Sequence, residues 1–485
     1  MGILQNFKYI SQSGVASIFN IVVSIIRVKI IAVLIGTSGV GLIGQLTNLI
    51  NISTFLSNLG MSTGFIREVS ISRSQQDQQR IIALRSTLVV CSIIASLVIS
   101  IIIFFNAKAI NSWLFRELDY VFYIKLLALN SNFIGYAGMF NALVKAEKLI
   151  RTLMKLSILV SSVNTVAAIL LIYWFNIDGV LYGIIANSLF NCIITGIIAQ
   201  KYRLLNGIIP SLRSKLLDKK IFALLIKFGV ISLITSIALQ LSYASVKSII
   251  IQNSGLPSAG IYQAASNISN QYLPVLLTSL GTYLLPHLAE IQSKEKMHKE
   301  GNNSLRLILL LAAPMLISFL AFSDLIVQIL YSKEFVASGS ILSVIIIGDL
   351  FKVSNKVLGT MIIAKNYIIT WLSVDILYAA SLPVFTLILY NDYGILSPAI
   401  GYMIAAFLGF LAFLLPLIFK EKFKIEFIVW KLFASIFASL VIVFMAKPYL
   451  NLIGLFLICL SLILLILIIN IRKHELKMVV DKYLK

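Results

Sequence analysis

Apolar stretches of about 20 residues, the length that crosses a membrane as a helix, recur from one end of this 485-residue chain to the other. Their apolar residues are continuous and do not alternate with polar ones, which favours membrane helices over a membrane β-barrel. Charged residues make up 12% of the chain, about half the share found in soluble domains. The sequence therefore predicts an all-α polytopic membrane protein.

We expect about 14 transmembrane helices, arranged as two parallel six-helix lobes around a central cavity, with two further helices at the C-terminus. The expected spans lie near residues 11–35, 41–65, 82–105, 120–144, 153–175, 178–200, 222–248, 259–287, 304–322, 338–364, 367–390, 394–418, 427–446 and 450–471.

Lysine and arginine gather in alternate loops between these spans. The loops assigned to the inner side hold most of them, whereas the outer loops hold only Lys108, Arg116, Lys333 and Lys447. Because positive loops stay in the cytoplasm, this asymmetry predicts that both termini are cytoplasmic. The formal net charge of +21 is therefore interpreted as a membrane-orientation signal, and no nucleic-acid partner is expected.

Two stretches of the chain resemble each other: VKIIAVLIGTSGVGLIGQLTNLIN at 28–51 and VKSIIIQNSGLPSAGIYQAASNISN at 246–270. Further echoes follow at an offset of about 215 to 219 residues. An even number of spans per copy gives both copies the same orientation, so the repeats are parallel. We expect a first lobe at 1–204 (helices 1–6), an interfacial linker helix at 205–221, a second lobe at 222–420 (helices 7–12), and helices 13–14 with a basic cytoplasmic tail at 421–485.

The first span carries polar residues at steps of four and three, which places them on one helix face. They are Ser13, Ser17, Asn20, Ser24 and Arg27. Arg27 is expected roughly 13 Å inside the membrane, where an arginine costs at least about 2.5 kcal/mol unless it is paired or hydrated. This stripe predicts a water-filled cavity. The alternative is a structural arginine bonded to carbonyls of a neighbouring helix.

The seventh span carries a matching stripe that includes Tyr243 and Lys247. Helical phase puts Lys247 close to the face of Arg27, and we expect these two cations to face each other across the space between the lobes. Lys29, two positions after Arg27, points to another side of its helix. We expect it to pack between helices or to extend toward the interface.

Further polar residues inside the apolar spans are candidates to line the cavity. The second and eighth spans carry amides on one face, and the fourth carries a lysine and a tyrosine: Asn48, Asn51, Asn267, Asn270, Lys125 and Tyr136. Amide side chains in a membrane either join helices or line a pore, and the sequence leaves both open.

Two carboxylates lie inside apolar spans, Asp349 in the tenth and Asp375 in the eleventh. Asp375 is expected some 12 Å deep, and buried carboxylates of this kind carry protons in transporters. We expect both to couple transport to an ion. Asp349 has a simpler alternative, because Lys352 one turn further along would neutralise it within the same helix.

The chain lacks the motifs of catalysis. It contains no Ser/His/Asp set, no HExxH and no P-loop. Its three cysteines all fall in apolar spans, which implies no disulfide framework, and its three histidines are scattered without metal-ligand spacing. We therefore expect a transporter and not an enzyme, with no catalytic residues, no metal and no cofactor, driven by an ion gradient, the membrane potential or the substrate gradient.

The segments KIIAVLIGTSGVGLIGQ and LSNLGMSTGFIREVS resemble the start of Wzx-type O-antigen flippases, which belong to the multidrug/oligosaccharidyl-lipid/polysaccharide (MOP) exporter superfamily. The resemblance implies a V-shaped pair of lobes around a cationic cavity that alternates its access. It implies that an undecaprenyl-diphosphate-linked oligosaccharide is flipped from the cytoplasmic to the periplasmic leaflet of a bacterial inner membrane. Many such flippases have twelve spans, so the role of the last pair stays open.

A lipid diphosphate requires cations at midplane depth, and arginine is suited to bidentate phosphate contacts. Arg27 and Lys247 are the first candidates for the diphosphate, and Lys125 and Lys352 the second. The sugar and the cavity wall are assigned to a larger polar set: Asn20, Ser24, Asn48, Asn51, Tyr136, Tyr243, Asn267 and Asn270. Asp349 and Asp375 are assigned to ion coupling. Besides the substrate and the bilayer, a polysaccharide polymerase and a chain-length regulator are partners to consider.

Other functions compete with this interpretation. A drug or metabolite exporter of the same fold would be expected to have a less cationic and more aromatic cavity. A membrane polysaccharide polymerase would need a sizeable outer loop with essential polar residues, and no loop of this sequence qualifies. A scaffold for polysaccharide assembly would leave the midplane cations unexplained.

Overall fold

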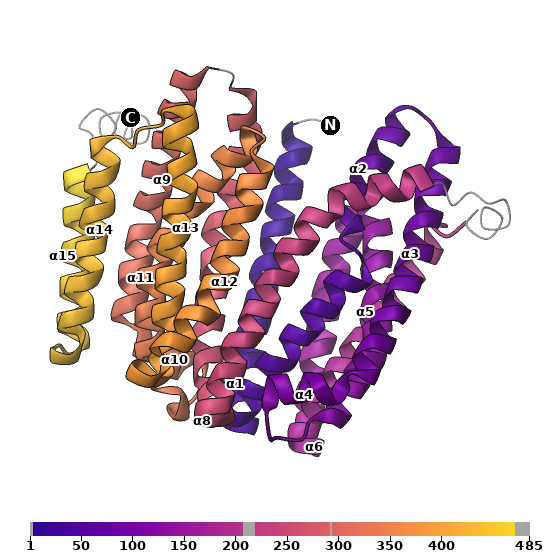
Figure 1. Cartoon of the computed structure of the whole chain (residues 1–485), viewed down its shortest axis with the longest axis horizontal. Coiled ribbons are helices and arrows are strands. Elements are labelled where there is room, and N and C mark those ends of the chain that lie inside the picture. Colours follow the sequence, from indigo (N-terminus) through magenta and orange to yellow (C-terminus); the bar gives the residue numbers. More distant parts are fainter. Residues whose placement is uncertain (1–2, 207–218, 292, 471–485) are drawn as a thin grey trace. The chain divides into compact units, whose positions relative to one another are not determined.

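The computed structural model describes residues 3–206, 219–291 and 293–470, and these residues form helices and no strand (Figure 1). The α-helices are α1 (Ile3–Ser57), α2 (Met61–Ser74), α3 (Gln78–Phe105), α4 (Ala107–Phe115), α5 (Val121–Ala146), α6 (Ile150–Lys201), α8 (Lys219–Glu290), α9 (Lys294–Ala321), α10 (Ser323–Leu330), α11 (Ser338–Ala364), α12 (Ile368–Tyr393), α13 (Ser397–Glu421), α14 (Phe427–Ala446) and α15 (Leu452–Asn470).

The predicted spans coincide with these helices, which confirms the all-α polytopic membrane fold. Seven stretches of the described chain are long and apolar enough to cross a membrane, and the longest of them, such as Val22–Ser74 with 53 residues, hold two predicted spans each. The second predicted span is interrupted, because α1 ends at Ser57 and α2 begins at Met61 after Gly60, which has a φ of 65°. The proposed interfacial helix falls mainly on 207–218, outside the described residues.

Residues with positive φ mark the internal repeat in the backbone. Left-handed conformations are costly for residues with a Cβ, yet they recur in pairs that lie 218 or 219 positions apart: Gly36 with Gly255, Lys148 with Asn366, Asn176 with Gly394, and Arg203 with Lys422. Gly36 and Gly255 kink α1 and α8, and Asn176 kinks α6. The helices of the two copies therefore bend or end at matching positions.

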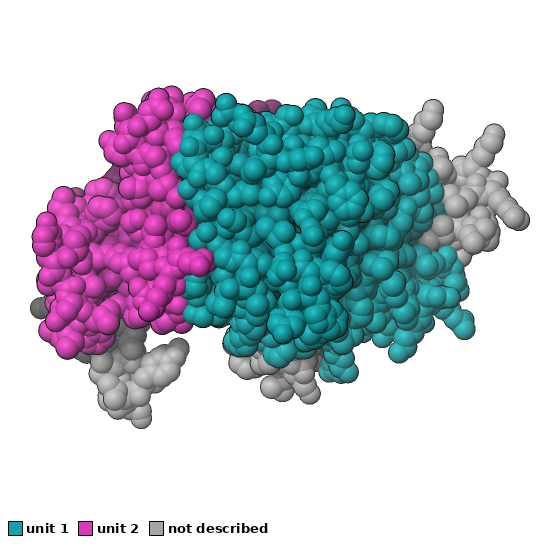
Figure 2. Space-filling view, turned by 90° about the horizontal axis from the view of Figure 1, so that it is seen from below, with its two compact units in different colours: residues 1–260, 330–332 teal, residues 261–329, 333–485 magenta. Residues whose placement is uncertain are grey.

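The chain divides into two compact units, residues 1–260 with 330–332 and residues 261–329 with 333–485, which Figure 2 shows in teal and magenta. The first unit includes residues 219–260, and these contain the predicted seventh span at 222–248. Its hydrophobic core lies where α2, α3 and α5 meet, with Phe65, Leu88 and Leu143 almost fully buried.

Two glutamates hold arginines at one end of the first unit. Glu147 accepts from Arg73 at 2.6 Å and from Arg85 at 2.5 Å, which ties α5 to α2 and α3. Glu68, which is 4% exposed, bonds Arg67 at 2.9 Å and Arg80 at 3.0 Å. These ion pairs neutralise part of the charge of a loop that the sequence assigns to the cytoplasm.

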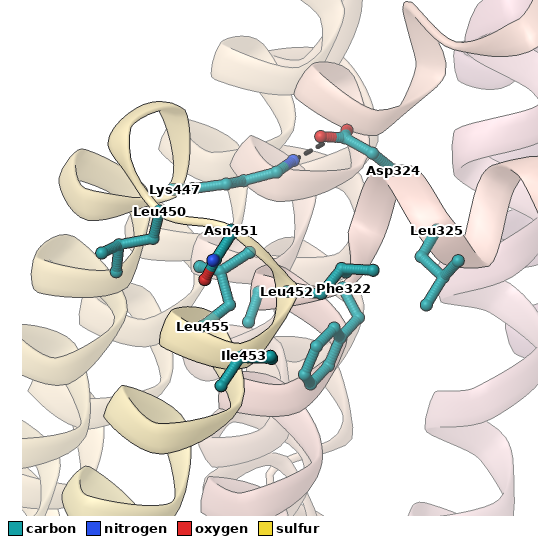
Figure 3. Close-up of a pocket in the computed structure, with 10 residues that line it drawn as sticks. Phe322, Asp324, Leu325, Lys447, Leu450, Asn451, Leu452, Ile453 and Leu455 are labelled. Carbon is teal, nitrogen blue, oxygen red and sulfur yellow. Dashed lines mark hydrogen bonds and ion pairs between the residues drawn. The ribbon is translucent and has the colours of Figure 1, made fainter.

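In the second unit, α14 and α15 pack on α9, and Lys447, between α14 and α15, bonds to α10 and α11. Its Nζ donates to Ser323 Oγ at 2.6 Å, Asp324 Oδ1 at 2.8 Å and Ser343 Oγ at 3.3 Å. Figure 3 shows this ion pair beside a pocket of about 660 Å³ whose other lining residues are mostly apolar. The lining includes none of the predicted substrate residues, so this pocket is separate from the site described next.

Candidate transport site

Lys247 is buried in the first unit against the second half of α1. Its side chain leaves the first half of α8, and the residue is 5% exposed. The Nζ donates to the carbonyl of Gly44 at 2.7 Å and to Asn48 Oδ1 at 3.2 Å. Two of the predicted site residues, Lys247 and Asn48, are therefore in direct contact, and the ammonium is bonded to protein in this conformation.

Gln45 completes this polar contact, and the sequence reasoning did not single it out. It is fully buried, accepts from Asn48 Nδ2 at 3.3 Å and donates to the carbonyl of Ala244 at 3.1 Å. The signal was its position, because Gln45 lies three residues before Asn48 and so on a neighbouring part of the same helix face.

One turn further along α1, Asn51 Nδ2 donates to Gln240 Oε1 at 3.2 Å. Along these contacts the residue numbers increase on α1 and decrease on α8, where the partners are Lys247, Ala244 and Gln240 in turn. The two helix halves therefore run antiparallel. We call these contacts the polar seam: Gly44, Gln45, Asn48 and Asn51 of α1 with Gln240, Ala244 and Lys247 of α8.

Arg27 lies in the first half of α1, before the kink at Gly36, and is half-buried. Within the described residues its guanidinium makes no hydrogen bond and no ion pair. On the same helix, Ser24 is half-buried and Asn20 Nδ2 donates to Ser157 Oγ of α6 at 2.8 Å. The alternative of an arginine bonded to neighbouring carbonyls has no support in the described part of the chain. The expected opposition of Arg27 and Lys247 stays a prediction.

The remaining predicted residues are spread over several helices. Lys125 lies over the ring of Phe104, 5.4 Å from its centroid. Tyr136 and Tyr243 are half-buried. In the second unit Asn267 accepts from Gln263 Nε2 at 2.6 Å, and Asn270 is exposed.

Asp349 of α11 is fully buried in the second unit, and three hydroxyls surround its carboxylate. Oδ2 accepts from Ser269 Oγ at 2.9 Å and from the hydroxyl of Tyr272, both on α8. Oδ1 accepts from the hydroxyl of Tyr402 on α13 at 2.5 Å. The sequence reasoning missed these three partners, because they are far from Asp349 along the chain and only the tertiary structure brings them together.

Lys352 and Asp349 attract each other electrostatically along α11, as expected, although the described structure shows no direct hydrogen bond between them. The Nζ of Lys352 lies over the ring of Tyr402, 5.3 Å from the centroid. Tyr402 therefore contacts the carboxylate through its hydroxyl and the ammonium through its ring. Asp375 of α12 is half-buried, and the nearby charge that acts on it is Lys356 of α11.

The partners of these acids decide what each can do chemically. Glu147 is held by two guanidinium groups, which only donate hydrogen bonds. The hydroxyls around Asp349 can both donate and accept. Its carboxyl can therefore gain a proton and still find acceptors, as an ion-coupling group must.

A family model described as "polysaccharide biosynthesis protein" matches residues 30–339, well over half of the chain. The chain belongs to this family. The match begins in the first half of α1 and includes the whole polar seam.

Two curated relatives share 27% identity with the chain over 377 residues, which is 77% of this chain and 89% of each relative. They are the lipid III flippases of Escherichia coli (strain K12) and Shigella flexneri. Among solved structures, the lipid II flippase MurJ in an inward closed conformation aligns over 99% of this chain and 100% of its own, with a TM-score of 0.72 and 15% identity.

A multidrug-resistance MATE transporter of the MOP superfamily aligns over 84% of this chain and 99% of its own, with a TM-score of 0.66 and 16% identity. At these identities the structural likeness shows the fold alone. Together with the family match and the curated relatives, it confirms the resemblance to the MOP superfamily. The protein is a multi-pass membrane transporter and not an enzyme.

Proposed function

We propose that this protein flips an undecaprenyl-diphosphate-linked oligosaccharide, such as an O-antigen repeat unit, from the cytoplasmic to the periplasmic leaflet of a bacterial inner membrane. It does so by alternating access between two lobes, residues 1–204 and 222–420. The relatives support a lipid cargo, because they are named as flippases of lipid III and lipid II. The diphosphate and the bacterial O-antigen setting are the further steps of the proposal.

The proposal depends mainly on the environment of Arg27. An arginine inside a membrane helix requires a partner or water, and within the described residues Arg27 has no hydrogen-bond or ion-pair partner. A diphosphate would satisfy it with two parallel hydrogen bonds. Asn20 and Ser24, on the same stripe of α1, are placed to meet polar groups of the same cargo.

Lys247 has a second role in the proposal. Its ammonium is bonded to Gly44 and Asn48 in this conformation, so it reaches a phosphate only when the polar seam opens. Lys125 and Lys352 lie over aromatic rings, which attract a cation. We assign them to the diphosphate after Arg27 and Lys247.

The test is complementation of a strain that lacks its own flippase. Arg27→Ala is expected to abolish surface polysaccharide while the protein is still inserted. Each lost hydrogen bond to a charged group weakens binding by roughly tenfold or more. Arg27→Lys keeps the positive charge but loses the two parallel N–H donors of the guanidinium, and it is expected to retain part of the transport.

Lys29→Ala is the matched control, because it removes a cation two residues away on another side of the same helix. We expect normal polysaccharide from it. Normal polysaccharide from Arg27→Ala, at parental protein levels, would exclude the diphosphate role.

A further inference from the structure

Two glycine contacts join the second predicted span to α8: one from Gly41 of α1 and one from Gly60, in the turn between α1 and α2. One pairs Gly41 with Gly260, and the other pairs Gly60 with Gly229. Gly41 and Gly60 are separated by about 28 Å of helical rise, which is close to the thickness of the hydrocarbon core. The polar seam lies between these two contacts and joins α1 to α8 from Gly44 to Asn51.

The Gly41–Gly260 contact is two-fold symmetric. A Cβ added at Gly41 would overlap the carbonyl oxygen of Leu256, and one added at Gly260 would overlap the carbonyl oxygen of Thr37. Gly41 matches Gly260 and Thr37 matches Leu256 at the 219-residue offset of the two kinks. At this contact each copy of the repeat therefore presents equivalent residues to the other.

The Gly60–Gly229 contact is equally close but joins unlike segments. A Cβ on Gly60 would lie 2.6 Å from the carbonyl oxygen of Gly229, and one on Gly229 would lie 2.7 Å from that of Gly60. The obstacles are backbone atoms, which cannot move aside as a flexible side chain can. Gly60 comes shortly before the arginine-rich loop assigned to the cytoplasm, whereas Gly41 follows the turn assigned to the outside.

We propose that Gly41–Gly260 is the outer gate and Gly60–Gly229 the inner gate of the transport path, and that this structure is closed at both. The inference rests on the proposed alternating access, in which the two repeat copies separate at one end at a time. Backbone contact without side chains lets each end close fully against water and ions. An added Cβ prevents closure at its own end and leaves the opposite gate intact.

The test uses the full-length chain with Cys91, Cys192 and Cys459 replaced by alanine and with Gln240→Cys as a reporter, because Gln240 lies on α8 between Gly229 and Gly260. A membrane-impermeant maleimide is applied from outside to spheroplasts and from inside to inverted vesicles. Gly260→Ala is expected to raise labelling from outside several-fold and to leave labelling from inside unchanged. Gly229→Ala is expected to do the reverse.

Gly183→Ala is the matched control, because a Cβ on that glycine of α6 would meet the Cα of Ala168 at an ordinary 3.4 Å; its labelling is expected to stay at the parental level. Alanine is favoured over glycine inside a helix, so a change at Gly260 or Gly229 reports the contact and not helix stability. If Gly260→Ala does not accumulate, Gly41→Ala tests the same gate from the other helix.

Parental labelling in both gate variants, or increased labelling on the same side in both, would show that these glycines only pack two static helices together and would overturn the inference. The labelling needs no substrate. A failure of the gates is therefore distinguishable from a failure of the proposed cargo, which is read from the polysaccharide made by Arg27→Ala.

Discussion

At the scale of single residues, the partners of a charged group decide what it is available to do. Lys447 and Lys247 are both cations in apolar surroundings, but each is bonded to oxygen atoms of the protein. Arg27 has no such bond within the described residues, so it is the candidate for an external anion. Asp349 is distinguished in the same way, because its partners are hydroxyls and not arginines.

Replacing Asp349 tests whether its carboxyl carries a proton. Asp349→Asn keeps the shape and can still pair with the three hydroxyls, but it cannot ionise. We expect flipping in proteoliposomes to lose its response to an imposed proton gradient. Asp375→Asn is expected to slow flipping at a fixed gradient. Asp392→Asn, an exposed position near the end of α12, is the control and should behave like the parent.

A response to the gradient that persists unchanged in Asp349→Asn would remove this residue as the coupling group. The hydroxyl cluster would then be a structural feature that holds α8, α11 and α13 together.

At the scale of the elements, kinks and end contacts place the helices that matter for transport. Gly36 divides α1 into two halves at a kink, and Gly255 divides α8 in the same way. This brings Gly41 and Gly260 together and leads into the polar seam. The last two helices, outside the repeat, are attached to α9 near the pocket of Figure 3, where Lys447 bonds Asp324 and two serines.

Lys447→Met tests how α14 and α15 are held. The substitution keeps the apolar stem of the side chain and removes hydrogen bonds to a partly buried ammonium. We expect the free energy of unfolding to fall by about 1–2 kcal/mol, measured as a lower thermal midpoint in detergent. Lys333→Met removes an exposed cation from another loop of the second unit and should have no effect. Equal midpoints for the two variants would contradict the attachment.

At the scale of the whole molecule, the internal repeat and the distribution of charge predict how the chain lies in the membrane. Matching positive-φ positions 218 or 219 residues apart show that the two copies bend at the same places. An even number of spans in each copy gives them the same orientation. The cations of alternate loops then predict which side is cytoplasmic.

The predicted orientation is tested with reporters fused to the full chain. Green fluorescent protein at the C-terminus is expected to fluoresce, because it folds in the cytoplasm, and alkaline phosphatase at the same position is expected to be inactive. Alkaline phosphatase inserted after Lys333 should be active. The opposite pattern would reverse the assignment of the inner and outer gates.

The membrane-helix class, the spans, the repeat and the flippase resemblance could all be predicted from the amino-acid sequence. Each of these depends on local composition or on spacing along the chain. The sequence also singled out Arg27, Lys247 and Asp349, because charged groups are costly in apolar spans wherever their partners are. The partners that hold those groups could not be predicted, because they come from distant parts of the chain. Tyr402 lies 53 positions from Asp349 and Gly44 lies 203 from Lys247, and no helical periodicity extends over such distances. The glycine contacts could not be predicted for the same reason. A glycine is required at these positions only because the backbone of a distant segment occupies the space that a side chain would need.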